Sequence, residues 1–236
     1  MAQPQQASVR NCLLAALPPA DFDLLRDSFE PVRLELRQLV IEAKEPIRHV
    51  YFPQSGIASI LADSSEGRIE VGMIGREGMA GLPAVLGIDR SLHDFMVQAV
   101  GEALRIGTDD LRAATRQSLS LQGRFMRYAH ALMIQTAQTA FANAAFTIEA
   151  RLARWILMTH DRVDGDELSL THDFLSMMLG VRRPGVTVAV QVLEGNKLIR
   201  ARRGRIPVLD RAGLEEVADD AYGAAEAEYA RVMGEA

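Results

Sequence analysis

The sequence predicts an α+β fold with a sheet-rich first half and a helical second half. Between residues 32 and 106, short apolar runs alternate with turn signals, a spacing typical of an antiparallel sandwich, roll or barrel. Residues 117–148 contain no proline and no glycine after Gly123, which is long enough for a helix of about eight turns. From residue 171 onward, helix caps, a turn glycine and a basic cluster follow one another.

The composition is that of an ordinary globular protein. The chain has 236 residues, 48% of them hydrophobic and 24% charged, so neither disorder nor a fibrous repeat is expected. No apolar run is long enough for a membrane span, and the polar start lacks the pattern of a signal peptide. The single cysteine, Cys12, cannot form an internal disulfide, which fits a cytoplasmic protein, and it leaves no cysteine set for an iron–sulfur cluster.

The net charge of −5 hides a strongly positive segment. Residues 180–213 carry eight basic and two acidic residues, whereas residues 214–236 carry one basic and seven acidic residues. Phosphate backbones are attracted by such a local basic surface. The acidic end is expected to form a helix, and the sequence assigns no purpose to it.

The first half is expected to begin with a helix over residues 13–30, interrupted near its start by Pro18 and Pro19. Turn signals then occur at 53–56, 64–67 and 75–78. The strands expected around these turns are residues 48–52, 57–62, 69–74, 95–100 and 103–106.

The helix over residues 117–148 carries an apolar stripe with alternating spacings of four and three residues, as in a coiled coil. The stripe consists of Leu121, Phe125, Tyr128, Leu132, Gln135, Thr139, Ala142 and Phe146. We expect a self-association helix; the alternative is a helix packed on its own domain. The residues expected at the dimer contact are Phe125, Tyr128, Leu132, Thr139 and Phe146.

Residues 168–209 predict two helices, a short turn between them and a basic hairpin. Thr171 is a good N-cap for the first helix, Gly180 ends it, and Pro184 is tolerated in the first turn of the second helix. The hairpin that follows has arginines at its tip. This order of elements predicts a winged helix-turn-helix, in which the second helix enters the major groove of DNA.

The second of these helices is predicted against a local strand signal. Valines alternate strictly from Val186 to Val192, which taken alone favours a strand. A strand would leave the preceding helix without a partner at the right distance. A helix places Val186, Val190 and Leu193 on one face, so we predict a helix.

The opposite face and the hairpin predict a DNA-binding surface. Thr171 offers its hydroxyl to a phosphate, and Arg183 offers two donors to a guanine edge. The hairpin arginines make binding dependent on salt. The alternative is a solvated basic hairpin on an ordinary helical subdomain. The predicted DNA-binding residues are Thr171, His172, Arg182, Arg183, Pro184, Thr187, Val188, Gln191, Arg202 and Arg203.

The sequence resembles the Crp/Fnr family of bacterial transcription regulators. The resemblance is clearest from Leu168 to Val186 and from Leu193 to Ile199, and it extends over nearly the whole chain. It implies a homodimer, with RNA polymerase as a candidate partner. The implied parts are a cyclic-nucleotide-binding-like β-roll in residues 1–116, a dimerisation helix in 117–147, a winged helix-turn-helix in 148–213 and an acidic tail in 214–236.

The recognition helix departs from the family's best-known members. Those members open this helix with an Arg-Glu pair and carry a second arginine four residues after the glutamate. The matching residues here are Arg183, Pro184 and Val188, so only the first is kept. We therefore expect a different operator, with Arg182 compensating.

The implied nucleotide pocket departs as well. Nucleotide-binding members carry a Gly-Glu pair for the ribose and an Arg-Ser pair for the phosphate. The first pair corresponds to Gly81 and Leu82, so the carboxylate is missing, and Arg90 with Ser91 matches the second. Arg90 is equally well explained as a solvated loop residue. These four residues form the candidate effector pocket, and a cyclic nucleotide is not the expected ligand.

The expected function is sequence-specific DNA binding by a homodimer on a palindromic operator, controlled by an unidentified small effector in the β-roll. The alternative is a sensor or interaction module that does not bind DNA specifically. No enzyme is expected, because the sequence lacks a nucleophile elbow and a dinucleotide fingerprint. No two histidines lie three or four residues apart, so no metal site or other cofactor is expected.

Overall fold

The computed structural model describes residues 3–64 and 67–234. The chain forms two compact units. Unit 1 comprises Met1–Leu61 and Met73–Leu132, and unit 2 comprises Ala62–Gly72 and Met133–Ala236. The middle of the predicted turn at 64–67 and the last two residues of the predicted tail lie outside the described residues.

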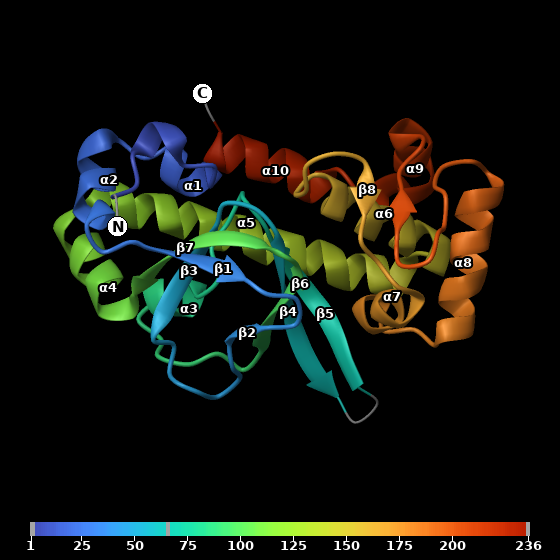
Figure 1. The fold of residues 1–236 in the computed structure, drawn as a ribbon, viewed down its shortest axis with the longest axis horizontal. Helices are drawn as coiled ribbons and strands as arrows, with labels where there is room; N and C mark the ends of the chain where they lie inside the picture. Colours follow the sequence, from blue (N-terminus) through green and yellow to red (C-terminus); the bar gives the residue numbers. More distant parts are fainter. Residues whose placement is uncertain (1–2, 65–66, 235–236) are drawn as a thin grey trace. The chain divides into compact units, whose positions relative to one another are not determined.

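Unit 1 is built on two sheets whose strands follow the orders β1-β7-β3 and β2-β6-β4-β5. The strands are β1 (Glu30–Leu34), β2 (Leu39–Ile41), β3 (His49–Pro53), β4 (Ile57–Ser64), β5 (Gly67–Ile74), β6 (Asp94–Ala99) and β7 (Gly101–Gly107). All five predicted strands are present, and the long hairpin of β4 and β5 is seen in Figure 1. Strands β1 and β2 were not predicted, because β1 is mostly exposed and β2 has only three residues.

Short helices complete unit 1. They are α1 (Cys12–Ala15), α2 (Pro19–Arg26), α3 (Leu82–Val85) and α4 (Thr108–Gln117), with the 3-10 turn η1 (Gln6–Ser8) ahead of them. The helix predicted over residues 13–30 is therefore two helices. Pro19 begins the second of them, where its missing N–H costs no hydrogen bond.

A row of aromatic rings holds the start of helix α5 (Leu119–Ala145) on unit 1. The ring centroids of Phe29 and Phe52 are 5.8 Å apart, and those of Phe52 and Phe125 are 6.1 Å apart. Both Phe52 and Phe125 are fully buried. The first half of α5 is thus part of the core of its own unit.

Helix α5 confirms the predicted long helix, but part of the predicted dimer stripe faces inward. Phe125 is 0% exposed and Tyr128 is 2% exposed, and the hydroxyl of Tyr128 donates to the carbonyl of Met79. Leu132, Thr139 and Phe146 are only half-buried. The prediction that Phe125 and Tyr128 lie in a dimer contact is wrong, because their side chains are buried within unit 1.

A second stripe on α5 is exposed. Met133 is 68% exposed and Phe141 is 48% exposed. The exposed residues that follow the coiled-coil spacing are Met126, Met133, Ala137, Ala140 and Ala144. This stripe, which we call the α5 outer stripe, offers an apolar surface with small residues in its second half.

Unit 2 holds the predicted helix-turn-helix. Its elements are α6 (Ile148–His160), β8 (Glu167–Leu168), α7 (His172–Leu179), α8 (Arg183–Gly195), β9 (Ile206–Pro207), α9 (Arg211–Ala218), η2 (Asp219–Ala221) and α10 (Ala224–Met233). The valine-rich segment is helical, as predicted. The acidic end forms two helices rather than one, and α9 begins before residue 214. Among the described residues, no helix is long and apolar enough to cross a membrane.

Candidate nucleic-acid interface

The first helix of the motif, α7, is defined by its caps. The Thr171 hydroxyl oxygen accepts a hydrogen bond from the backbone N–H of Phe174 at 3.2 Å, which leaves the hydroxyl proton for another acceptor. Gly180 ends the helix with a left-handed φ of 61°. Thr171 thus lies at a helix N-terminus, where backbone N–H groups favour a phosphate.

The turn between α7 and α8 is held from several sides. The Ser176 hydroxyl donates to the carbonyl of Val181, and the Arg151 guanidinium donates to the carbonyl of Leu179. A Cβ at Gly180 would lie 3.1 Å from the side chain of Ile69 in strand β5. The positive φ favours glycine at position 180, and any side chain there would also press against Ile69.

Helix α8 separates its residues into a buried and an exposed face. Val186 and Leu193 are 0% exposed and Val190 is 1% exposed, as the helical interpretation predicts. The exposed residues of α8 and its N-cap are Arg182, Arg183, Pro184, Val188, Gln191, Val192, Glu194 and Gly195. The first five belong to the predicted DNA-binding set, and the last three, toward the end of the helix, do not.

Arg183 has a partner on the neighbouring helix. Its Nε lies 3.2 Å from the carboxylate oxygen Oδ1 of Asp173, and both side chains are mostly exposed. An exposed ion pair contributes about 0–1 kcal/mol. A guanine edge, which offers two acceptors to a guanidinium, can therefore displace Asp173 at small cost.

Thr187 is engaged within the motif. Its hydroxyl donates to the carbonyl of Arg183 at 3.1 Å, and its oxygen lies 3.3 Å from Nδ1 of His172. Because a hydroxyl has one proton, Thr187 then faces a ligand only as an acceptor. His172 is half-buried at the start of α7 and joins the two helices through this contact.

The basic hairpin is present and is tied to β8. Bridges pair Ile199 with Val208 and Arg202 with Arg205, and Gly204 turns with a φ of 74°. Strand β9 also pairs with β8, which was not predicted because each strand has only two residues. We call residues 198–209 the wing.

The wing arginines differ in their partners. The guanidinium of Arg205 lies 2.8 Å from Glu167 in β8. Arg202 and Arg203 are exposed, and among the described residues neither forms an ion pair. The positive charges of these two residues are therefore available to an anionic partner.

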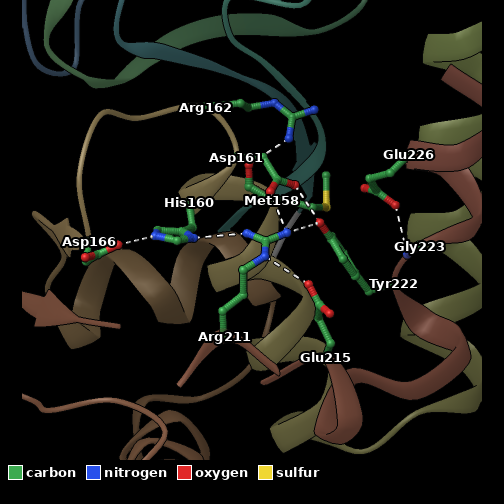
Figure 2. Close-up of polar contacts among 10 residues, drawn as sticks. All are labelled: Met158, His160, Asp161, Arg162, Asp166, Arg211, Glu215, Tyr222, Gly223 and Glu226. Atoms are coloured by element: carbon green, nitrogen blue, oxygen red, sulfur yellow. Dashed lines mark hydrogen bonds and ion pairs between the residues drawn. The ribbon is translucent and has the colours of Figure 1, made fainter. Parts of the chain in front are cut away.

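A polar cluster around Arg211 fixes α9 to the end of α6, as Figure 2 shows. The guanidinium of Arg211 lies 2.8 Å from Asp161 and 2.9 Å from Glu215. It also donates to the hydroxyl of Tyr222 at 2.8 Å, and that hydroxyl donates to Asp161 at 2.7 Å. Burial and the hydrogen bond to Asp161 raise the pKa of Tyr222 well above its usual value.

The same cluster sets the tautomer of His160. Arg211 lies 3.0 Å from Nδ1 of His160 and has only protons to donate. Nδ1 must therefore be the acceptor, and the ring proton lies on Nε2, which is 2.9 Å from Asp166. Arg211 thus joins α9, the end of α6 and the segment before β8 (Figure 2).

Replacing Arg211 by alanine is expected to destabilise the protein by about 2 kcal/mol, because several hydrogen bonds to charged groups are removed together. Urea unfolding followed by circular dichroism measures the change. Arg231→Ala is the matched control, since Arg231 pairs with Glu228 on the same helix, and it should leave the unfolding midpoint unchanged. Equal midpoints for the two variants would contradict the structural role of Arg211.

Residues from the β4–β5 hairpin complete unit 2, and sequence reasoning missed them. The indole Nε1 of Trp155 donates to Glu70 at 2.8 Å, and the two residues are 3% and 6% exposed. The ring of Trp155 packs edge-on against Phe174 at 6.3 Å. The available signal was a carboxylate at position 70 within the otherwise apolar run of residues 69–74.

Arg154 lies beside this contact. It is 5% exposed and donates to the hydroxyl of Thr139 at 3.1 Å. Burial lowers its pKa, and the charges of Glu226 and Glu70 act in the opposite direction. A cavity of about 20 Å³ between these side chains has room for about one water molecule.

The predicted effector residues all lie in unit 1. Leu82 is 8% exposed and begins α3 after Gly81, whose φ is 112°. The Arg90 guanidinium is exposed and donates to the carbonyl of Lys44 at 3.1 Å. Ser91 is 8% exposed, and its hydroxyl accepts from the N–H of His93. The side chains of Arg90 and Ser91 are therefore engaged locally.

A hollow of about 350 Å³ lies elsewhere in unit 1, between β2, β3 and the segment that joins them. Its lining consists of Leu39, Val40, Ile41, Glu42, Glu45, Pro46, Ile47, Arg48, His49 and Tyr51. None of the four predicted effector residues lines it. Within residues 3–64 and 67–234, no group of three metal-ligating side chains occurs.

Comparisons with known proteins identify a domain family in each half of the chain. Residues 31–118 match the family model of the cyclic nucleotide-binding domain, and residues 150–217 match that of the Crp-like helix-turn-helix domain. A search of curated proteins finds no match.

The fold is similar to those of solved regulators. FixK2 from Bradyrhizobium japonicum has 13% identity and a TM-score of 0.70, with 81% of this chain and 98% of that one covered. A transcriptional regulator of the Crp/Fnr family from Eubacterium rectale has 17% identity and a TM-score of 0.68, with coverages of 87% and 97%. A CRP family regulator from Thermus thermophilus has 21% identity and a TM-score of 0.65, with coverages of 79% and 96%.

These identities show the shared fold, and the two family models add the nature of each domain. The β-sheet domain, the long helix α5 and the helix-turn-helix follow one another in the order found in those structures. The chain belongs to the Crp/Fnr family of transcriptional regulators.

Proposed function

We propose that the protein binds a palindromic DNA operator as a homodimer and regulates transcription there. The observation that carries this proposal is the exposed basic face of the helix-turn-helix. Arg182 and Arg183 lie at the start of α8, and Arg202 and Arg203 lie on the wing. All four side chains are exposed. Carboxylates are scarce in this segment, which carries eight basic and two acidic residues over positions 180–213.

Each group has a role that its geometry supports. Arg183 lies in the first turn of α8, the part of a recognition helix that meets base edges. Thr171 and the N-terminus of α7 bind a phosphate, and His172 supports that position through its contact with Thr187. Gln191 is exposed two turns after Pro184 and contacts phosphate or base. Arg202 and Arg203 follow the DNA backbone.

The α5 outer stripe supports the homodimer. A 27-residue helix with exposed apolar residues at coiled-coil spacing pairs readily with a second copy of itself. The alanines of its second half allow the two helices to approach closely. A symmetric dimer then presents its two α8 helices to half-sites about 10 base pairs apart.

Control by a small effector in the β-roll is supported by the β4–β5 hairpin. Its base belongs to unit 1, whereas Ile69 and Glu70 belong to unit 2, where Glu70 accepts a hydrogen bond from Trp155 and Ile69 lies close to Gly180. A ligand that shifts the hairpin would therefore disturb the turn before the recognition helix. Trp155 is the only tryptophan in the chain, so its fluorescence reports such a shift in a screen of metabolites.

Replacing both Arg202 and Arg203 by alanine is expected to weaken binding equally on all duplex sequences. The slope of log K against log salt should fall by about 0.9 for each phosphate that the variant no longer neutralises. Fluorescence anisotropy over a range of potassium chloride concentrations measures it. Arg231→Ala removes one positive charge from α10, far along the chain from the wing, and should leave the slope unchanged.

The same titration tests the proposed function itself. The intact protein should bind any duplex at low salt and one operator more tightly at physiological salt. A dimer without affinity for duplex DNA at low salt would instead support an interaction module. A change of sequence preference in the double variant would contradict the backbone role of the wing.

A further inference from the structure

The exposed face of the recognition helix is unusually apolar. Val188 is 53% exposed and Val192 is 42% exposed, whereas Val186 and Val190 on the other face are buried. The buried pair is explained by the core of unit 2. For the exposed pair, packing within the described residues does not account for a branched apolar side chain.

Val188 occupies the position where a recognition helix meets the bases. It is the sixth residue of α8, one turn beyond Pro184, and residues four apart share a face of a helix. Gln191, three residues after Val188, is exposed on the same side, and Arg183 is exposed in the first turn of the helix. A duplex bound along the exposed side of α8 therefore brings base edges against the Val188 side chain.

A valine discriminates between bases in one way only. Its side chain neither donates nor accepts a hydrogen bond, so a polar base edge pressed against it loses water without compensation. Thymine alone offers a methyl group in the major groove, and apolar side chains contact that group. Val188 thus favours thymine at the position it covers.

The nearest neighbours of Val188 offer no competing donor to the base it covers. Pro184 has no polar side-chain atom, and the Thr187 hydroxyl gives its proton to the carbonyl of Arg183. Gln191, whose amide does donate, lies one turn further along α8, where it reaches a different base or a phosphate. Val192 lies one turn beyond Val188 and nearer the end of α8, where such helices leave the groove.

On the basis of the proposed function, we propose that Val188 recognises the C5-methyl group of a thymine in each half-site of the operator. The specificity of this protein then combines the polar contacts of Arg183 and Gln191 with one methyl contact by Val188. The ligand class is a duplex with thymine at a fixed position in both half-sites.

Deoxyuridine tests this directly, because it differs from thymidine only by the missing methyl group. Each thymidine of the tightest operator from a random duplex pool is replaced in turn by deoxyuridine, symmetrically in both half-sites. Dissociation constants are measured by fluorescence anisotropy at fixed salt. We expect one position at which binding weakens by about fourfold for each half-site, the effect of one buried methyl group.

Val188→Ala should remove most of this sensitivity, since alanine reaches less far toward the base. The side chain is exposed, so the variant should fold, and circular dichroism checks this. Val192→Ala is the matched control and should keep the full sensitivity to deoxyuridine.

Four outcomes overturn the proposal. Specific binding with no sensitivity to deoxyuridine at any position would refute methyl recognition while leaving the proposed function intact. Sensitivity that Val188→Ala keeps, or that Val192→Ala loses instead, would refute the assignment of the methyl contact to Val188 and also leave the proposed function intact. A protein that selects no sequence from the pool at any salt concentration would refute the proposed function together with this inference.

Discussion

Replacing Met133 by aspartate is expected to turn the proposed dimer into a monomer and to weaken binding to its operator by about 100-fold. Met133 belongs to the α5 outer stripe and is 68% exposed, compared with 38% for Met126. A carboxylate placed in a dimer contact would have to be buried without a partner, which is costly. Separate protomers also lose the effective concentration that links two half-sites, an effect of about 10² or more.

Analytical ultracentrifugation measures the change in mass, and anisotropy with the full operator measures the loss of affinity. Arg127→Asp is the control on the same helix, because Arg127 is exposed and lies about 120° around the helix from Met133. This variant should remain a dimer. A Met133→Asp protein that sediments as a dimer and binds with unchanged affinity would exclude the α5 outer stripe as the contact.

Replacing Arg183 by alanine is expected to abolish the preference for one guanine in each half-site, a loss of about 1–3 kcal/mol of discrimination. The guanidinium is exposed at the start of α8 and is paired with the exposed carboxylate of Asp173. Once the side chain is gone, nothing at that position offers two donors to a guanine edge.

The preference is measured as the ratio of dissociation constants for the operator and for a version with that guanine replaced. The ratio should be large for the intact protein and close to one for Arg183→Ala. Arg203→Ala should lower affinity for both duplexes and keep the ratio. An equal loss on every sequence for Arg183→Ala would assign Arg183 to the phosphate backbone instead.

The helix-turn-helix could be predicted in detail because its signals are local. Thr171 and Gly180 cap α7, and both act as their residue types suggest. The alternating valines of α8 locally favour a β-strand, but the segment is helical because a helix can pack against α6 and α7. Val186 and Val190 are buried only because the helical period turns both toward α6 and α7.

The face of α5 that packs against its own unit could not be predicted from periodicity. The helix has two apolar stripes with the same spacing, and the sequence does not show which one meets its own domain. Phe52 decides this, since its ring contacts Phe125 from a strand about seventy residues away. Long-range packing of this kind leaves no trace within the helix itself.

The contact between Glu70 and Trp155 was beyond sequence reasoning for the same reason, since the residues are 85 positions apart. The effector residues show a related limit. Leu82 replaces the carboxylate of the family's ribose contact and is buried, and Arg90 matches the phosphate-binding arginine, but its guanidinium is bound to the carbonyl of Lys44. A motif match places a residue in the chain, whereas its neighbours decide where the side chain points.

The most direct test of DNA recognition by a homodimer is selection of bound sequences from a random duplex pool, with protein purified without added ligand. The account predicts an enriched palindrome whose half-sites lie about 10 base pairs apart. If a ligand must be supplied first, metabolites that shift the fluorescence of Trp155 are added and the selection is repeated. A pool that shows only salt-sensitive binding without enrichment in every condition would contradict sequence-specific recognition by this protein.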